Sequence, residues 1–122
     1  MSNPILIVDD DVDACALAAK LLWQWEYQAD VALDGFSALE LVEKQRYSLA
    51  IIDYQMPGMN GIELFRRIRK LRPDMKGIFL TGFTTIDVVY PAIEAGIVHV
   101  LAKPVDFEKL LPMIEEILGT PA

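Results

Sequence analysis

Short apolar runs alternate along the chain with longer stretches in which apolar residues recur at helical spacing. The first run, PILIV at 4–8, is apolar throughout, which is typical of a strand covered on both faces of a parallel sheet. The clearest run, LAIID at 49–53, ends at a carboxylate. The pattern predicts strands at 4–8, 29–33, 49–53, 77–81 and 98–102, and helices at 11–27, 35–45, 61–71, 85–96 and 106–119.

Five strands that alternate with five helices predict parallel βαβ units with right-handed crossovers, and hence a single doubly wound α/β sandwich. In such a fold the functional site lies beyond the carboxyl ends of the strands. Four of the five predicted strands end at polar or charged residues, and the second does not, as expected of an edge strand. The residues at these strand ends are Asp9, Asp10, Asp53, Thr81 and Lys103. We expect them to meet at one edge of the sheet.

Polar residues precede three of the predicted helices and are suited to cap them. Asn60 comes directly before the helix at 61–71. Asp34 or Ser37 suits the start of the helix at 35–45. Of the three consecutive acids at 9–11, at least one is expected to cap the first helix.

Length and composition indicate one globular domain, 1–122. Of the 122 residues 53% are hydrophobic, which excludes a disordered chain. No apolar run approaches the roughly 20 residues of a membrane span, and no basic region precedes the first apolar run as in a signal peptide. We therefore expect no membrane partner and a cytoplasmic location. Cys15 is the single cysteine, so an internal disulfide is excluded, and we interpret it as a packed helix residue.

The charge balance disfavours nucleic acid as a direct partner. The formal net charge is −7, which repels a phosphate backbone. One basic stretch, FRRIRKLRP at 65–73, departs from this balance. Because its apolar residues recur at helical spacing, we interpret its cations as the solvent-facing side of a helix in preference to a patch for nucleic acid or a partner, which stays the alternative.

The expected crowding of Asp9, Asp10 and Asp53 has a chemical consequence. Two carboxylates about 4 Å apart repel by about 4 kcal/mol at an effective dielectric constant near 20, so the cluster needs cations. Lys103 can supply one positive charge, and a hard divalent ion bound through oxygen, for which Mg²⁺ fits best, can supply the rest. A carboxylate beside Mg²⁺ and an ammonium can act as a nucleophile toward phosphorus.

The segments ILIVDDD, LAIIDYQMPGMNGIEL, IFLTG and AKP, in this order and spacing, resemble the receiver domain of two-component response regulators over essentially the whole chain. The resemblance implies a flavodoxin-like (βα)5 fold with the strand order 2-1-3-4-5. It implies that Asp53 accepts a phosphoryl group from a sensor histidine kinase or a histidine phosphotransfer protein, and that Thr81 and Lys103 contact this group. It also implies an output domain or partner protein, which the sequence does not identify, and a homodimer is possible. The bond before Pro104 is often cis in this family.

The same resemblance implies how a metal is held. Mg²⁺ would be bound by Asp10, Asp53 and the backbone carbonyl of Gln55, with Asp9 assisting through water. Such a domain draws a phosphoryl group onto itself and then loses it to water. It is therefore expected to be a switch and not a turnover enzyme.

Two residues depart from the family pattern. An aromatic switch residue usually stands three positions before the lysine, and here that position is Val100. Phe83, Tyr90 and His99 are the candidates to replace it. Pro91 lies within the fourth predicted helix, where proline removes an amide bond and clashes, at a cost of about 3 kcal/mol. We predict that this helix is kinked, or is regular only from about Pro91 onward.

Two other functions remain open at this point. ILIVDDDVD also fits the strand and Asp-x-Asp motif of a haloacid-dehalogenase-type phosphatase, with Asp9 as nucleophile and Asp11 as acid, although the chain is short and Val-Asp stands where Gly-Thr is usual. A pseudo-receiver, a protein-binding module without phosphorylation, is kept open by Val100 and Pro91. Flavin binding is disfavoured, because three acids after the first strand would repel its phosphate.

Overall fold

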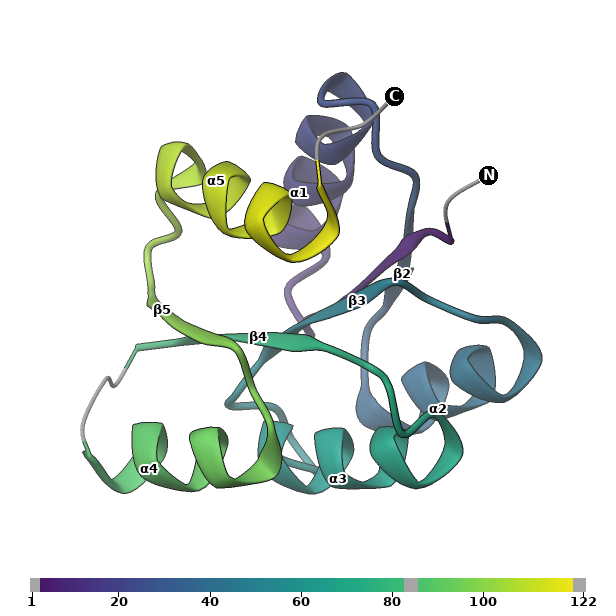
Figure 1. The fold of residues 1–122 in the computed structure, drawn as a ribbon, viewed down its shortest axis with the longest axis vertical. Coiled ribbons are helices and arrows are strands. Elements are labelled where there is room, and N and C mark those ends of the chain that lie inside the picture. Colours follow the sequence, from purple (N-terminus) through teal and green to yellow (C-terminus); the bar gives the residue numbers. More distant parts are fainter. Residues whose placement is uncertain (1–2, 83–85, 120–122) are drawn as a thin grey trace.

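The computed structural model describes residues 3–82 and 86–119, and Figure 1 shows strands and helices alternating along them. The strands are β1 (Ile5–Val8), β2 (Ala29–Ala32), β3 (Leu49–Asp53), β4 (Gly77–Thr81) and β5 (His99–Ala102). The helices are α1 (Val12–Gln24), α2 (Gly35–Lys44), α3 (Gly61–Leu71), α4 (Ile86–Ala95) and α5 (Phe107–Leu118). The predicted alternation is confirmed, and the largest difference is at α1, which ends at Gln24 and not at 27. None of these helices is long and apolar enough to cross a lipid bilayer.

All five strands are parallel, in the order β2-β1-β3-β4-β5, so the predicted doubly wound, flavodoxin-like topology is confirmed. In this order β1 lies beside β3, and Val8 is in register with Ile52. In both strands the next residue is an acid: Asp9 follows Val8, and Asp53 follows Ile52. The strand order therefore makes neighbours of two carboxylates that are far apart in the sequence.

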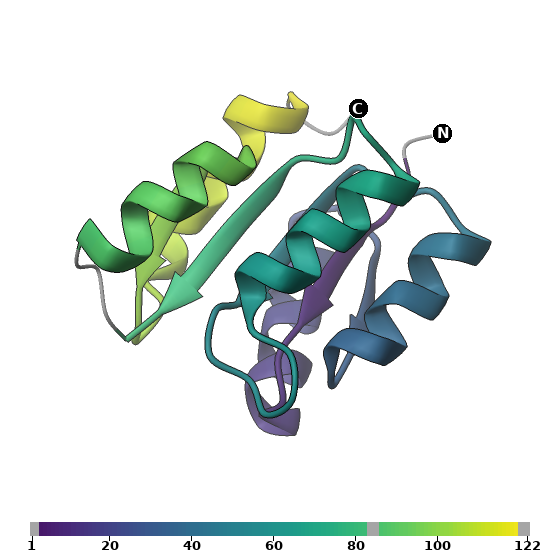
Figure 2. The same ribbon diagram turned by 90° about the horizontal axis from the view of Figure 1, so that it is seen from below.

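The sheet is the middle layer of three. In Figure 1, α1 and α5 cover one face, whereas α2, α3 and α4 cover the other, where Figure 2 shows them side by side. Successive side chains of β1 point to opposite faces: Leu6 and Val8 join the core under α2, α3 and α4, and Ile5 and Ile7 join the core under α1 and α5. All four are buried. This two-sided burial is why the strand is apolar at every position.

Side-chain oxygens cap the helices as predicted. Asn60 accepts a hydrogen bond from a backbone N–H in the first turn of α3, and Asp34 does the same for α2. Asp11 caps α1 and accepts from two backbone N–H groups. Since Asp11 is used in this way, Asp9 and Asp10 are the acids that remain for the edge of the sheet.

α4 runs as one helix from Ile86 to Ala95 with Pro91 inside it. The prediction that it is regular only from Pro91 onward is therefore wrong, while a bend at Pro91 stays a prediction. Proline removes a single N–H donor, whereas Val88 and Ala92 on either side of it are buried, and their burial favours continuing the helix. α5 contains Pro112 in the same way.

Candidate functional site

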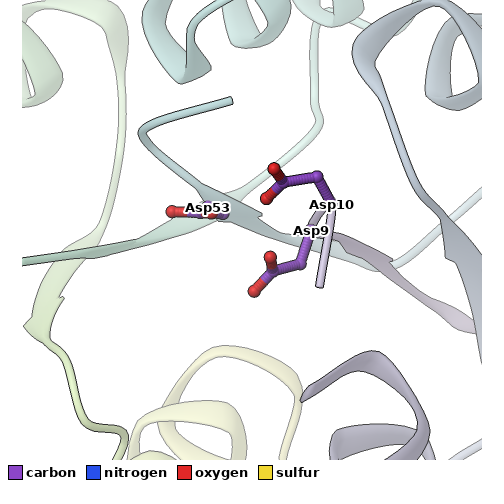
Figure 3. Close-up of side chains that lie close together, drawn as sticks. All are labelled: Asp9, Asp10 and Asp53. Atoms are coloured by element: carbon purple, nitrogen blue, oxygen red, sulfur yellow. The ribbon is translucent and has the colours of Figure 1, made fainter. Parts of the chain in front are cut away.

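Three carboxylates gather where β1 and β3 end (Figure 3). Asp9 and Asp10 follow β1, and Asp53 is the last residue of β3. One carboxylate oxygen from each residue lies within 4.8 Å of those from the other two. Asp9 and Asp53 are only 4% and 5% exposed, whereas Asp10 is exposed to solvent. Negative charge is thus concentrated at the edge of the sheet where strand ends were expected to meet.

Lys103, which follows β5, brings an ammonium into this cluster. Its Nζ lies 3.2 Å from Asp53 Oδ2 and 3.4 Å from Asp9 Oδ2. Its backbone N–H donates to the Thr81 carbonyl at 2.9 Å, which continues the pairing of β4 with β5 up to the site. The Lys103–Pro104 bond that follows is cis. The two Nζ distances show that the ammonium is directed at both buried acids.

The surroundings shift the ionisation of Asp53 and Lys103. Burial raises the pKa of Asp53, and the charge of Asp9 adds to this, while Lys103 and the backbone N–H of Gln55 act in the opposite direction. That N–H donates to Asp53 Oδ1 at 3.3 Å. Burial disfavours the ammonium of Lys103, but the Asp53 and Asp9 carboxylates outweigh it and raise the pKa of Lys103. With Asp10 included, one ammonium faces three carboxylates within residues 3–82 and 86–119, so this part of the chain leaves the cluster short of positive charge.

The loop between β3 and α3 is held tightly beside Asp53. The Tyr54 N–H donates to the Leu80 carbonyl, and the Gly61 N–H donates to the Tyr54 carbonyl at 2.9 Å. A Cβ on Gly61 would lie 3.0 Å from Tyr54 Cα, so the close approach of these two backbones needs glycine. Gly58 has a φ of +85°, which also favours glycine. These contacts explain the turn residues that follow the strand.

Thr81 and Gly82 form the rim of the site at the end of β4. Asp53 is in register with Leu80, so Thr81 lies at the same sheet edge as the acids, and its side chain is fully buried. A Cβ on Gly82 would meet no atom of residues 3–82 and 86–119 within 4 Å. Gly82 and Gln55 are both exposed to solvent.

The switch candidates lie away from these contacts, and one falls outside the described residues. Tyr90 is 60% exposed on α4, and Val100 on β5 packs against the core under α4. His99 Nε2 lies 3.4 Å from Glu116 Oε1 on α5. Within residues 3–82 and 86–119, neither Tyr90 nor His99 forms a hydrogen bond or ion pair with the clustered acids or Lys103. Phe83 lies between the described ranges.

Cys15 has a position at the site that the sequence did not reveal. Its Sγ donates to the Asp9 carbonyl at 3.2 Å, so the thiol helps to fix the backbone from which the Asp9 carboxylate projects. Burial, followed by the charge of Asp9, raises the pKa of Cys15 to about 11, so the group stays a neutral thiol near pH 7. A separation of six residues across a helix cap gives no sequence signal for this contact.

A cavity of about 350 Å³ lies between α1 and α5, and the sequence did not predict it. Its lining is mainly apolar and also includes Asp9, Asp11 and Lys103. The small side chains of Ala14 and Ala18 leave this space, yet in the sequence they are ordinary helix residues.

The chain is similar to response regulators in sequence and in structure. The family model described as "Response regulator receiver domain" matches residues 5–115. The chain is 34% identical to the transcriptional regulatory protein ZraR of Klebsiella oxytoca over 94% of this chain, and it spans only 26% of that protein. It is 30% identical to sporulation initiation phosphotransferase F of Bacillus subtilis, covering 97% of this chain and 95% of that one. The structure of response regulator protein TrrA from Thermotoga maritima in complex with Mg²⁺-BeF matches with a TM-score of 0.85 and 30% identity, over 97% of this chain and 100% of that one.

Proposed function

The chain belongs to the receiver domains of two-component response regulators, and on this premise we propose that it is a phosphorylated switch in which Asp53 accepts the phosphoryl group. The donor would be a sensor histidine kinase or a histidine phosphotransfer protein, which puts the reaction in the cytoplasm. One observation carries the proposal: the Asp53 carboxylate is buried at a strand end, 3.2 Å from the Lys103 ammonium and beside two further acids.

The donor set of the cluster fits Mg²⁺. Among the described residues, three carboxylates offer oxygen ligands within 4.8 Å of one another, and one ammonium is paired with them. Neither histidine nor cysteine belongs to the group, which favours a hard cation over zinc or copper. In the proposal Asp10, Asp53 and the carbonyl of Gln55 hold the ion, and Asp9 acts through water. When bound, Mg²⁺ would neutralise charge on the phosphoryl oxygens.

The chain's own residues have separate tasks in the transfer. A carboxylate oxygen of Asp53 attacks phosphorus, the bond from phosphorus to the donor imidazole nitrogen breaks, and its electron pair stays on that nitrogen. An acyl phosphate on Asp53 results. The Lys103 ammonium, already directed at Asp53, offsets the charge of the arriving phosphoryl oxygens, and the Thr81 hydroxyl donates to one of them. Gly82 is exposed and has no side chain, which favours approach of the donor.

The new charge at Asp53 would act on a partner by shifting a balance between two conformations. Val100 is not aromatic, so the change cannot use an aromatic side chain at that position. The output partner and any homodimer belong to the proposal as well. Regulators such as ZraR are much longer than the part that this chain matches.

Phosphorylation of Asp53 is tested with acetyl phosphate and Mg²⁺, with intact mass read by mass spectrometry. We expect one added phosphoryl group on the wild-type chain and none on Asp53→Asn. Asp74→Asn is the matched control, because Asp74 is an exposed acid outside the helices and strands, and it should be labelled like the wild type. Labelling that survives in Asp53→Asn would overturn the assignment.

The alternatives make different predictions in this experiment. A pseudo-receiver, which Val100 favours, would stay unlabelled with acetyl phosphate and with a phosphorylated histidine donor. A haloacid-dehalogenase-type phosphatase would use Asp9 as nucleophile and Asp11 as acid. However, Asp11 accepts hydrogen bonds from the N–H groups of Asp13 and Ala14 as the cap of α1, so this carboxylate already has another role.

A further inference from the structure

Nearly half of the basic residues of this acidic chain lie on or directly after one helix. The formal net charge is −7, with 11 basic residues in all. Five of them fall within seven consecutive positions on or directly after α3: Arg66, Arg67, Arg69, Lys70 and Arg72. Such clustering calls for an explanation that solubility alone does not provide, because the remaining surface is dominated by acids.

Folding accounts for some of these cations. Arg69 donates from Nε to the Met75 carbonyl at 2.8 Å, and its guanidinium lies 5.3 Å from the centre of the Phe65 ring. Arg72 donates from Nη2 to the Glu43 carbonyl at 3.4 Å. These two side chains tie α3 to its surroundings.

Arg66 and Lys70 have no such role. Both are exposed, and neither forms a hydrogen bond or ion pair within the ranges that the structure describes. Arg67 is paired with Glu63 at 3.3 Å, an exposed ion pair one helical turn apart that contributes little to stability. The spacing of 66, 67 and 70 puts the three cations on one side of α3.

These three cations line a groove between α3 and α4, which lie side by side (Figures 1 and 2). The groove has a volume of about 620 Å³, and Tyr54, Ile62 and Pro91 add apolar surface to it. The one acid in the lining, Glu63, is the partner of Arg67. The groove thus combines two cations that have no partner among the described residues with some apolar surface, in a molecule that is negative overall.

We infer that the α3–α4 groove is a docking site for an acidic segment of a partner protein, one that carries Asp or Glu together with apolar side chains. Charge complementarity selects the occupant: carboxylates would meet Arg66 and Lys70, and apolar side chains would cover Tyr54 and Pro91. A nucleic acid is a poorer match. Its phosphates would continue past the groove and be repelled by the rest of a chain whose formal net charge is −7. This inference goes beyond the switch proposed above and does not depend on it.

The test is fluorescence anisotropy at low salt with a fluorescein-labelled peptide, Glu-Glu-Leu-Glu-Glu-Leu, and with the same peptide carrying Gln for Glu. The intact chain is compared with Arg66→Glu/Lys70→Glu and with a matched charge control, Lys20→Glu/Lys109→Glu. The control residues are exposed on α1 and α5, which cover the other face of the sheet. We expect the groove variant to bind the acidic peptide about tenfold more weakly or worse, and the control variant to stay within about twofold of wild type.

The binding should also weaken as salt is raised, because exposed charges are screened. Equal binding of the Gln peptide, equal losses in both variants, or absence of binding to wild type would overturn the inference. Tighter binding of a single-stranded DNA 20-mer than of the acidic peptide would replace it with a nucleic-acid surface. Labelling of Asp53 by acetyl phosphate is measured on the groove variant in parallel and should be unchanged, so a negative result here leaves the proposed switch intact.

Discussion

Asp53 lies where its own negative charge is disfavoured. Burial and the neighbouring Asp9 raise its pKa, and Lys103 compensates only in part. A residue that had only to support the fold would be better replaced by a neutral side chain of the same shape. The strained electrostatics at this position therefore indicate a functional requirement for a carboxylate.

This strain predicts that metal-free Asp53→Asn is more stable than the wild type at pH 7. Because the pKa of Asp53 is raised on folding, the folded chain holds this proton more tightly than the unfolded chain. The resulting stability is complete below the ordinary aspartate pKa and is lost as pH rises through the raised one. We expect a gain on the order of 1 kcal/mol in the free energy of unfolding, measured by urea denaturation in EDTA.

The gain should shrink toward zero as pH falls to the ordinary aspartate pKa of 3.8, because the raised pKa keeps wild-type Asp53 protonated there in the folded chain. Asp74→Asn, an exposed acid outside the helices and strands, should leave stability nearly unchanged at both pH values. An Asp53→Asn variant less stable than the wild type at pH 7 would contradict the reading that ionised Asp53 destabilises the fold.

The residues that meet at the sheet edge were largely predictable, whereas the contacts that each of them makes were not. Acids and a lysine at strand ends are visible in the sequence, because parallel strands end at the same edge. The choice among the three consecutive acids needed coordinates: Asp11 caps α1, Asp9 is buried against Lys103, and Asp10 is exposed. The thiol contact from Cys15 to the Asp9 carbonyl had no signal in the sequence at all.

At the scale of elements, helix and strand positions followed from periodicity, and the exceptions have local causes. The first helix was predicted to reach residue 27 from the helical spacing of its apolar residues, and WQWEY contains no glycine or proline that would end it. It ends at Gln24, and Glu26 has a positive φ of 70°. Glycine is the residue that usually indicates this conformation after a helix, so a glutamate here did not predict the helix end. At Pro91 the error was the opposite one, because the helix begins before this residue and not at it. Residues on both sides of Pro91 are buried, and their burial favours a helix that continues through the proline.

The two internal prolines predict a gain in stability when they are replaced. Pro91 is the sixth residue of α4, and Pro112 is the sixth residue of α5. Alanine at either position restores an N–H donor to the helix and removes a ring that crowds the preceding turn. We expect Pro91→Ala and Pro112→Ala each to raise the free energy of unfolding by about 1–3 kcal/mol in urea titrations.

A gain in stability at Pro112 without one at Pro91 would have a simple meaning. Packing of the half-buried Pro91 ring would then stabilise the fold by as much as the lost hydrogen bond destabilises it. The single-helix description of α4 would survive that result. Loss of stability in both variants would contradict the predicted gain, because proline would then be the favoured residue at these positions.

At the scale of the whole molecule, the fold class followed from alternation alone, but the strand order rested on the resemblance. Five βαβ-linked strands can be wound in more than one order, and only the order observed places β1 beside β3 and so Asp9 beside Asp53. The α3–α4 groove and the cavity between α1 and α5 depend on how helices pack across the sheet. Such spaces are properties of the assembled layers and are not encoded in any short segment.

The surplus of negative charge at the sheet edge makes global stability a readout of metal binding. A cation that binds only the folded chain raises the free energy of unfolding, by about 2.7 kcal/mol when its concentration is 100 times Kd. We expect Mg²⁺ to raise the wild-type melting temperature and EDTA to reverse the effect. NaCl of equal ionic strength, which only screens charge, should do much less.

Asp10→Asn separates metal binding from folding in this measurement. The Asp10 carboxylate is exposed and forms no hydrogen bond within residues 3–82 and 86–119, so its loss should leave the metal-free melting temperature nearly unchanged. The same change removes one of the three oxygen donors, and the shift produced by Mg²⁺ should fall by more than half. A full Mg²⁺ response in Asp10→Asn, alongside a full response in Asp74→Asn, would mean that the ion stabilises the chain from elsewhere. The clustered acids would then need another counter-ion to explain why three of them share an edge with one lysine.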